Sequence, residues 1–274
     1  MKSQIEKAEH FLKMHETPDI LVLPNAFDAI SARILAAEGF PALATTSGGC
    51  AFSLGYCDGE NITREEMIEV VGRISRAVDV PVSADMEAGF GVAPEKVAET
   101  VEMTIAAGAV GINIEDSEKG GKRALLDHHL SIERIQAARH AIDHSGVPMV
   151  LNARTDAFTV GSEDPITEAI KRANAYLDSG ADCVFVIGVS NSDVIGRLAS
   201  EINGPLNILA GAQSPTIPEL AELGVKRVTF GSGFAKVALT VVKESAKQLR
   251  ESGSYSWLKG VLGQPDIHGL LGRN

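Results

Sequence analysis

Residues 80–108 read VPVSADMEAGFGVAPEKVAETVEMTIAAG, a short apolar run followed by a longer segment of helical character. The run 80–87 has the length and composition of a buried strand. The segment 94–108 begins with Pro and closes on Gly, as α-helices commonly do. The stretch therefore predicts one strand followed by one helix, the unit from which parallel sheets are built.

The same unit recurs along the chain. Helix-like sequence follows each of eight strand-like runs, which begin at Ile20, Ala42, Val80, Val110, Pro148, Cys183, Leu206 and Arg227. Eight strand–helix alternations predict an α/β fold, the (β/α)8 TIM-type barrel, with strands buried on both faces. A doubly wound open sheet is the alternative, but no G-x-G-x-x-G motif follows the first run, where its dinucleotide-binding turn would lie.

No composition shift or Pro/Ser-rich linker divides the 274 residues, so we expect a single barrel domain over residues 1–274. Its last helix is expected near 234–249, followed by a C-terminal helical tail at about 250–274. The tail carries several apolar side chains that need a surface to pack against, either the protein's own barrel or a neighbouring subunit. These residues are Trp257, Leu258, Val261 and Leu262.

The bulk composition excludes some partners. The formal net charge of -11 and the absence of a basic stripe argue against nucleic acid or an anionic membrane. No apolar run reaches transmembrane length, and residues 1–16 lack the apolar stretch of a signal peptide. The three cysteines fit no zinc or redox motif, so we expect a reducing, cytoplasmic setting.

Polar side chains gather where three neighbouring runs end, which in a barrel is the active-site face. Because side chains alternate along a strand, residues two apart share a face. Ile112 and Ile114 are expected to face the helices. The residues predicted to face inward are Asp85 and Glu87, then Asn113 and Glu115, then Asn152, Arg154 and Asp156.

Carboxylates without nitrogen or sulfur ligands suit Mg²⁺, or Mn²⁺. None of the seven histidines ends a strand-like run, which disfavours a His-ligated zinc site, and no lysine ends one, which disfavours a Schiff-base aldolase. The structural alternative is that Arg154 neutralises Asp85 or Glu115 inside a salt-bridged polar layer.

The loop after the second run, residues 45–60, adds a small-residue turn and another carboxylate. The N–H groups of Ser47, Gly48 and Gly49 can approach an anion closely. Asp58 follows as a fourth carboxylate. Cys50 and Cys57 are interpreted as small fillers, because no histidine lies nearby in sequence to activate them.

Five segments together resemble the isocitrate lyase and phosphoenolpyruvate mutase superfamily, in order from about residue 23 to residue 157. They are PNAFDAISARILAAEGFPALATTSGG (24–49), LGYCDGE (54–60), PVSADMEAGFG (81–91), GINIEDS (111–117) and NARTDA (152–157). The resemblance implies that Asp85 binds Mg²⁺ directly or through water. Asp58, Glu87 and Glu115 would complete the metal shell, largely through waters.

The resemblance also implies roles around the substrate. Ser47, Gly48 and Gly49 would hold a carboxylate and an oxo group, with Asn113 beside them, and Arg154 would pair with substrate negative charge. The implied catalytic residues are Asp58, Arg154 and Glu115. The resemblance further implies a homo-oligomer, a tetramer built as a dimer of dimers that exchange the C-terminal helix.

The chain departs from the superfamily in three places. Residues 115–130 read EDSEKGGKRALLDHHL, which lacks both the Lys-Lys/Arg-Cys-Gly-His motif of the lyases and the gating-loop motif of the mutases. Thr45 stands where relatives carry an aromatic residue, and Glu87 stands where Asp is usual. Gly120 and Gly121 suggest a mobile lid, with a static surface turn as the alternative.

These observations predict a Mg²⁺-dependent enzyme that acts on a small 2-oxo or 2-hydroxy dicarboxylic acid through a metal-stabilised enolate, cleaving a C–C bond. One alternative is P–C chemistry of the phosphoenolpyruvate mutase or phosphonopyruvate hydrolase type, for which Lys119, Lys122 and Arg123 offer cations. Another is a catalytically weak 2-oxo acid binding protein that kept the metal and lost the catalytic acid.

Overall fold

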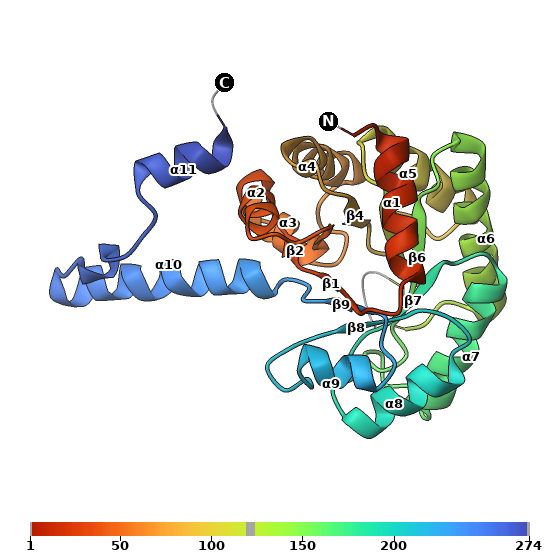
Figure 1. Ribbon diagram of the computed structural model, residues 1–274. Helices are drawn as coiled ribbons and strands as arrows, with labels where there is room; N and C mark the ends of the chain where they lie inside the picture. Colours follow the sequence, from red (N-terminus) through yellow and green to blue (C-terminus); the bar gives the residue numbers. More distant parts are fainter. Residues whose placement is uncertain (1, 119–123, 273–274) are drawn as a thin grey trace.

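The computed structural model describes residues 2–118 and 124–272 (Figure 1). All strand pairs in these residues are parallel and form one sheet in the order β1-β9-β8-β7-β6-β5-β4-β3-β2. The strands are β1 (Leu21–Leu23), β2 (Asn25–Ala26), β3 (Leu43–Thr45), β4 (Val82–Asp85), β5 (Gly111–Glu115), β6 (Val150–Thr155), β7 (Cys183–Val186), β8 (Leu206–Leu209) and β9 (Arg227–Thr229). The predicted TIM-type α/β barrel is confirmed.

The first predicted strand is interrupted, so eight expected strands become nine. Pro24 has no N–H to donate to the ladder and separates β1 from β2. β1 pairs with β9, and β2 pairs with β3. Because β1 and β2 are consecutive in the chain, this break is also where the two ends of the sheet meet and the barrel closes.

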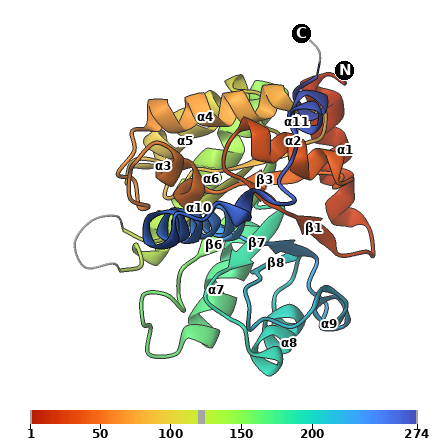
Figure 2. The ribbon, with the colours of Figure 1, turned by 90° about the vertical axis from the view of Figure 1, so that its left-hand side faces the viewer.

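Most of the helices pack around the outer face of the sheet, whereas α10 extends away from it (Figures 1 and 2). The helices are α1 (Gln4–Glu16), α2 (Ala29–Ala37), α3 (Ser47–Ser53), α4 (Arg64–Ala77), α5 (Pro94–Ala106), α6 (His128–Ser145), α7 (Pro165–Asp178), α8 (Ser192–Glu201), α9 (Ile217–Glu222), α10 (Gly233–Ser252) and α11 (Gln264–Leu271), with a 3₁₀ turn at Ser256–Leu258. Gly39, Gly108 and Gly180 follow the ends of α2, α5 and α7 at φ of 88°, 95° and 100°, the left-handed conformation expected there.

Two apolar clusters form the core. The larger lies between sheet and helices and contains Ile112 and Ile114, as alternation predicts. The smaller fills the barrel interior at the end where the strands begin, and there Phe11 of α1 packs against inward-facing strand residues. A Cβ at Gly111 would lie 2.7 Å from the Phe11 ring, so this position requires Gly for α1 to close the barrel end.

Helix α10 leaves the barrel as a long arm, and Figure 2 looks along it. Among its residues, only Ala235 is buried. Several large apolar side chains of the arm are exposed, and so are those of the segment after it. They are Phe234, Val237, Leu239, Val241, Val242, Leu249, Trp257, Leu258, Val261 and Leu262.

The chain then turns back, and α11 contacts α2, where Arg33 Nη1 donates to the carbonyl of Leu270 at 3.0 Å. In the described part of the chain, no helix combines the length and apolar character needed to cross a membrane.

His15 makes the closure of the barrel by α1 sensitive to acid. Burial, reinforced by the charge of Arg227, lowers the pKa of His15 to about 4. The unfolded chain takes up this proton near pH 6.5 and the folded chain only near pH 4, so the free energy of unfolding falls as pH decreases through this window, by about 3 kcal/mol at most. Urea unfolding of wild type and His15→Gln between pH 4 and 7 measures the effect. The variant is expected to show a smaller pH slope, and identical slopes would contradict the assignment.

Candidate active site

A cavity of about 490 Å³ opens at the carboxyl ends of the strands. Asp85, Glu115, Leu209 and Thr229 line it, and each is the last residue of its strand. Of the residues predicted for the site, the lining includes Ser47, Asp58, Asp85, Asn113, Glu115 and Arg154. The structure therefore brings together most of the predicted set at the predicted end of the barrel.

Ser47 links two of the carboxylates. Its backbone N–H and its hydroxyl both donate to Asp85 Oδ2 at 3.0 Å, and the hydroxyl lies 3.2 Å from Asp58 Oδ1. The second oxygen of Asp85, Oδ1, is buried and has no hydrogen-bond partner among residues 2–118 and 124–272. Thr45 supports the arrangement, because its hydroxyl accepts a hydrogen bond from the backbone N–H of Asp85 at 2.9 Å. The site thus holds one carboxylate oxygen that no described protein group satisfies.

The predicted Ser-Gly-Gly turn is instead the start of a helix. Residues 47–49 form the first turn of α3, capped by Thr46, whose hydroxyl accepts from the N–H of Gly49 at 3.3 Å. A Cβ at Gly48 would lie 2.9 Å from Asp58 Oδ2, so Gly at this position lets Asp58 approach Ser47. The N–H groups of Ser47 and Gly49 therefore donate to protein acceptors in this structure.

Glu87 is the one predicted metal ligand that does not line the cavity. The strand ends at Asp85, and Glu87 has a left-handed φ of 50°, which ends the alternation that predicted a shared face with Asp85. Its carboxylate accepts a hydrogen bond from the N–H of Glu60 at 2.7 Å, and Glu87 is not among the cavity-lining residues. The strand alternation that predicted a shared face with Asp85 therefore does not extend to Glu87, and its role as a metal ligand stays a prediction.

Two charged residues hold the loop that follows Glu87. Glu60 Oε1 accepts from the N–H groups of Ala88 and Phe90, at 3.1 and 3.0 Å. From the other side, buried Arg134 of α6 donates to the carbonyls of residues 88, 91 and 92. Phe90 has a φ of 56°, so these contacts maintain a strained backbone beside the cavity.

Arg154 pairs with two carboxylates. Its Nη1 lies 2.6 Å from Glu115 Oε2 and its Nε lies 2.7 Å from Asp156 Oδ1. Burial favours the neutral guanidinium, but the charges of Glu115, Asp156 and Asp85 outweigh it and raise the pKa of Arg154 above its usual range. The salt-bridged alternative therefore holds for Glu115, and Arg154 also lines the cavity.

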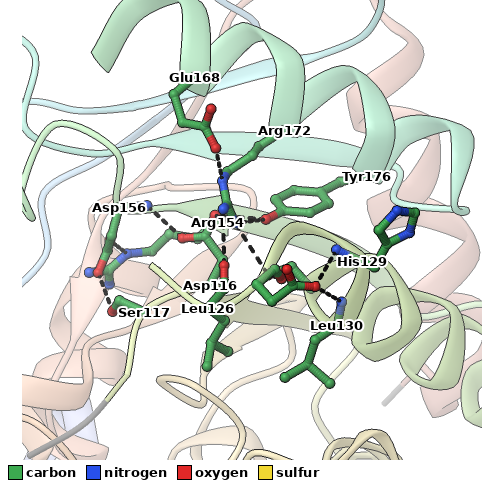
Figure 3. A network of polar contacts seen from close by, with 12 residues as sticks. Asp116, Ser117, Leu126, His129, Leu130, Arg154, Asp156, Glu168, Arg172 and Tyr176 are labelled. Carbon is green, nitrogen blue, oxygen red and sulfur yellow. Dashed lines mark hydrogen bonds and ion pairs between the residues drawn. The ribbon is translucent and has the colours of Figure 1, made fainter. Parts of the chain in front are cut away.

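A second layer of polar contacts lies behind Arg154 (Figure 3). Asp116 Oδ1 accepts from the backbone N–H of Asp156 at 2.9 Å, and Oδ2 accepts from the hydroxyl of Tyr176 at 2.7 Å. Arg172, on the same helix as Tyr176, lies 3.3 Å from Asp116 and donates to the carbonyl of Leu126 at 2.9 Å. Helix α7 thereby fixes the ends of β5 and β6, which carry Glu115 and Arg154.

Of the two cysteines in residues 45–60, Cys50 fits its predicted role as a small buried filler, whereas Cys57 is exposed and does not. Cys50 is fully buried, and burial raises the pKa of its thiol to about 12. At neutral pH the thiol is therefore protonated and poorly nucleophilic. Cys57 is exposed and lies outside the cavity lining.

Known proteins resemble this chain in sequence and in fold. The model of the phosphoenolpyruvate phosphomutase family matches residues 11–250. The chain belongs to that family. The resemblance that the five sequence segments predicted is confirmed.

Similar proteins of this family carry several names. This chain is 34% identical over 257 residues to the oxaloacetate decarboxylase of Bradyrhizobium sp. (strain ORS 278), and the match covers 89% of this chain and 86% of the relative. A candidate lyase/mutase of Burkholderia cenocepacia J2315 superposes with a TM-score of 0.92 at 38% identity, covering 97% and 95% of the two chains. An oxaloacetate acetylhydrolase, solved with the product oxalate, superposes with a TM-score of 0.88 at 26% identity, covering 98% and 94%.

The residues of this family protein fit an aquated Mg²⁺ ion. Within residues 2–118 and 124–272, no group of three or more His, Cys, Asp or Glu side chains forms a ready-made metal site. Mg²⁺ keeps several waters and commonly takes only one or two carboxylates from the protein. Asp85 Oδ1 supplies one buried, unsatisfied oxygen, and Asp58 and Glu115 line the same cavity.

Sequence reasoning missed the residues that support the site, namely Glu60, Asp116, Arg134, Arg172 and Tyr176. A signal was present for two of them, because Glu168, Arg172 and Tyr176 are spaced four apart and place a charge within the buried face of α7. The predicted lid glycines, Gly120 and Gly121, and the cations Lys119, Lys122 and Arg123 lie outside the described residues.

Removing the Tyr176 hydroxyl tests the supporting layer. Burial raises the pKa of Asp116, and the hydrogen bond from Tyr176 opposes this shift. Tyr176→Phe leaves a buried carboxylate short of one donor, so we expect it to lower the free energy of unfolding by about 1–3 kcal/mol in urea titrations. The matched control is Tyr255→Phe, at an exposed position, which is expected to have no effect. Equal effects of the two changes would contradict the supporting role.

Proposed function

We propose that the protein is a Mg²⁺-dependent carbon–carbon lyase that acts on a small 2-oxo or 2-hydroxy dicarboxylic acid. The observation that carries this proposal is the buried, unpartnered Oδ1 of Asp85 at the wall of a cavity lined by carboxylates. Such oxygen donors suit a hard divalent cation. When bound, Mg²⁺ supplies the positive charge that stabilises negative charge developing on the substrate oxygen.

The chain's own residues supply the remaining steps. Arg154, held by Glu115 and Asp156, binds a substrate carboxylate in a fixed orientation. Asp58 lies beside the Ser47 hydroxyl and accepts the proton of a 2-hydroxyl group as the C–C bond breaks. In a 2-hydroxy acid the C2 fragment leaves as the carbonyl compound, and the bonding electron pair stays on the departing carbon as an enolate, which takes the proton back from Asp58. In a 2-oxo acid such as oxaloacetate the bond to the distal carboxylate breaks, CO₂ leaves, and the electron pair forms the enolate of pyruvate, which takes a proton from water.

C–C cleavage is favoured over P–C chemistry by the charge of the cavity. Asp58, Asp85, Glu115 and Glu118 are carboxylates, and Arg154 is the single cation among the described lining residues. A phosphonate dianion carries one more negative charge than a carboxylate at the same position, and the described lining residues offer no second cation beside Arg154 to compensate it. The names of the oxaloacetate decarboxylase and oxaloacetate acetylhydrolase relatives support dicarboxylate chemistry.

The exchanged-helix assembly remains part of this proposal. The exposed apolar residues of α10 and of the segment after it form an apolar surface larger than a soluble protein usually leaves in contact with solvent. A second copy of the chain offers the same arm and the same barrel, so mutual exchange buries both surfaces in a symmetric way. We therefore expect a homo-oligomer, with a tetramer as a dimer of such dimers.

Asp85→Asn tests the metal site. The amide keeps the size of the side chain and removes its charge, so we expect Mg²⁺ affinity measured by calorimetry to fall at least tenfold while the melting temperature stays close to that of the wild type. Asp178→Asn is the control at an exposed position outside the cavity. Unchanged Mg²⁺ affinity in Asp85→Asn would show that the metal site is misplaced.

A substrate screen tests the reaction. Oxaloacetate, 2-methylisocitrate, 2,3-dimethylmalate and phosphonopyruvate are incubated with protein and Mg²⁺, and pyruvate, glyoxylate and phosphate are measured. We expect a C–C substrate to release pyruvate or glyoxylate. Phosphate release from phosphonopyruvate would instead support P–C chemistry, and binding without turnover would support a 2-oxo acid binding protein.

Changes on the arm test the assembly. Deleting residues 254–274, or replacing Val237 and Val241 together with Ser, is expected to lower the molar mass measured by light scattering. Lys243→Ser is the control on the same helix and should leave the mass unchanged. A wild-type monomer, or variants with the wild-type mass, would argue against exchange of the arm.

A further inference from the structure

Arg227, the first residue of β9, is a buried cation inside the barrel and beneath the cavity. Its side chain is fully buried. Thr229, two residues further along the same strand, lines the cavity. Because residues i and i+2 of a strand share a face and rise about 3.3 Å per residue, Arg227 lies one side-chain layer below the cavity floor.

The immediate partners of Arg227 are neutral. Nη2 donates to Ser83 Oγ at 3.2 Å and Nη1 lies 3.5 Å from His15 Nε2, whereas Nε has no hydrogen-bond partner in the described part of the chain. The guanidinium carbon lies 5.9 Å from the centre of the Phe11 ring. His15 is uncharged at neutral pH because burial lowers its pKa to about 4. No ion pair involves Arg227 among the described residues.

Two acidic groups nevertheless act on Arg227 at longer range. Burial lowers the pKa of Arg227 to about 10, and the charges of Cys183 and Asp85 oppose that shift. Burial also raises the pKa of the Cys183 thiol to about 12, so Cys183 is uncharged at neutral pH. This leaves Asp85 as the anionic partner. Ser83, the hydrogen-bond acceptor of Arg227, lies two residues before Asp85 on the same strand.

The cavity needs such a charge. Asp58 and Asp85 both contact the Ser47 hydroxyl, and within the described residues neither belongs to an ion pair. Arg154 forms its ion pairs with Glu115 and Asp156 instead. A charge buried inside the barrel is not screened by salt as a surface charge is, so it acts on the cavity without contact.

We propose that Arg227 is an electrostatic positioning residue whose buried charge offsets the carboxylates of the cavity from below and favours binding of an anionic substrate. The proposal rests on the proposed function for the identity of the two ligands. It requires a specific pair of opposite effects. Removing the charge should strengthen binding of a cation in the cavity and weaken binding of an anion, because both sense the same potential.

The experiment uses Arg227→Met and Arg227→Gln, which remove the charge with different packing. MgCl₂ alone is titrated by calorimetry, and oxalate is titrated at saturating Mg²⁺. In both variants we expect the Kd for Mg²⁺ to fall and the Kd for oxalate to rise, each roughly tenfold, at 50 mM and at 300 mM salt alike. Phe11→Leu is the control, because it changes the packing beside Arg227 without changing the charge, and it should not separate the two affinities.

The outcomes distinguish this inference from the proposed function. If the wild-type protein binds Mg²⁺ and oxalate, and the Arg227 variants leave both Kd values unchanged or shift both in the same direction, the inference alone is overturned. Wild-type protein that binds neither probe would overturn the proposed function and the inference with it. Opposite shifts that also appear in Phe11→Leu would assign the effect to packing and overturn the role of the charge.

Discussion

The alternation of side chains in a closed parallel sheet is the constraint on which the site depends. Residues one position apart point either to the helices or to the barrel axis, so Ile112 joins the outer core while Asn113 faces the interior. Because all strands run in one direction, their carboxyl ends meet in one ring, and polar residues from β4, β5 and β6 converge there. The same constraint places Arg227 directly beneath this ring.

The barrel and its inward-facing residues could be predicted from the sequence because both follow from local period and repetition. The pattern of the run 80–87 predicts a strand and that of the segment 94–108 predicts a helix. The eight repeats of this strand–helix unit then predict the fold. Asp85, Asn113, Glu115 and Arg154 follow from counting two along each strand. These predictions needed no knowledge of contacts between distant parts of the chain.

The remaining features depend on such contacts. The left-handed backbone of Glu87 ends the alternation one step early, and it is held by Glu60, which is 27 residues away in sequence. The anchoring of Asp116 by Tyr176 joins residues 60 apart. No local sequence pattern predicts these hydrogen-bonded pairs. The interrupted first strand could have been foreseen, since Pro24 cannot donate to a ladder and lies within the run that begins at Ile20.

Cleavage through an enolate is the central claim, and for a 2-oxo substrate, whose cleavage leaves the enolate of pyruvate, it can be tested on pyruvate itself. Pyruvate is incubated with protein and Mg²⁺ in D₂O, and the methyl protons are followed by NMR. If the cavity stabilises an enolate, the methyl signal should decline at a rate that depends on both protein and Mg²⁺, because each enolate that forms returns to pyruvate with deuterium. Methyl protons that persist at the protein-free rate, while pyruvate is shown to bind, would contradict the account.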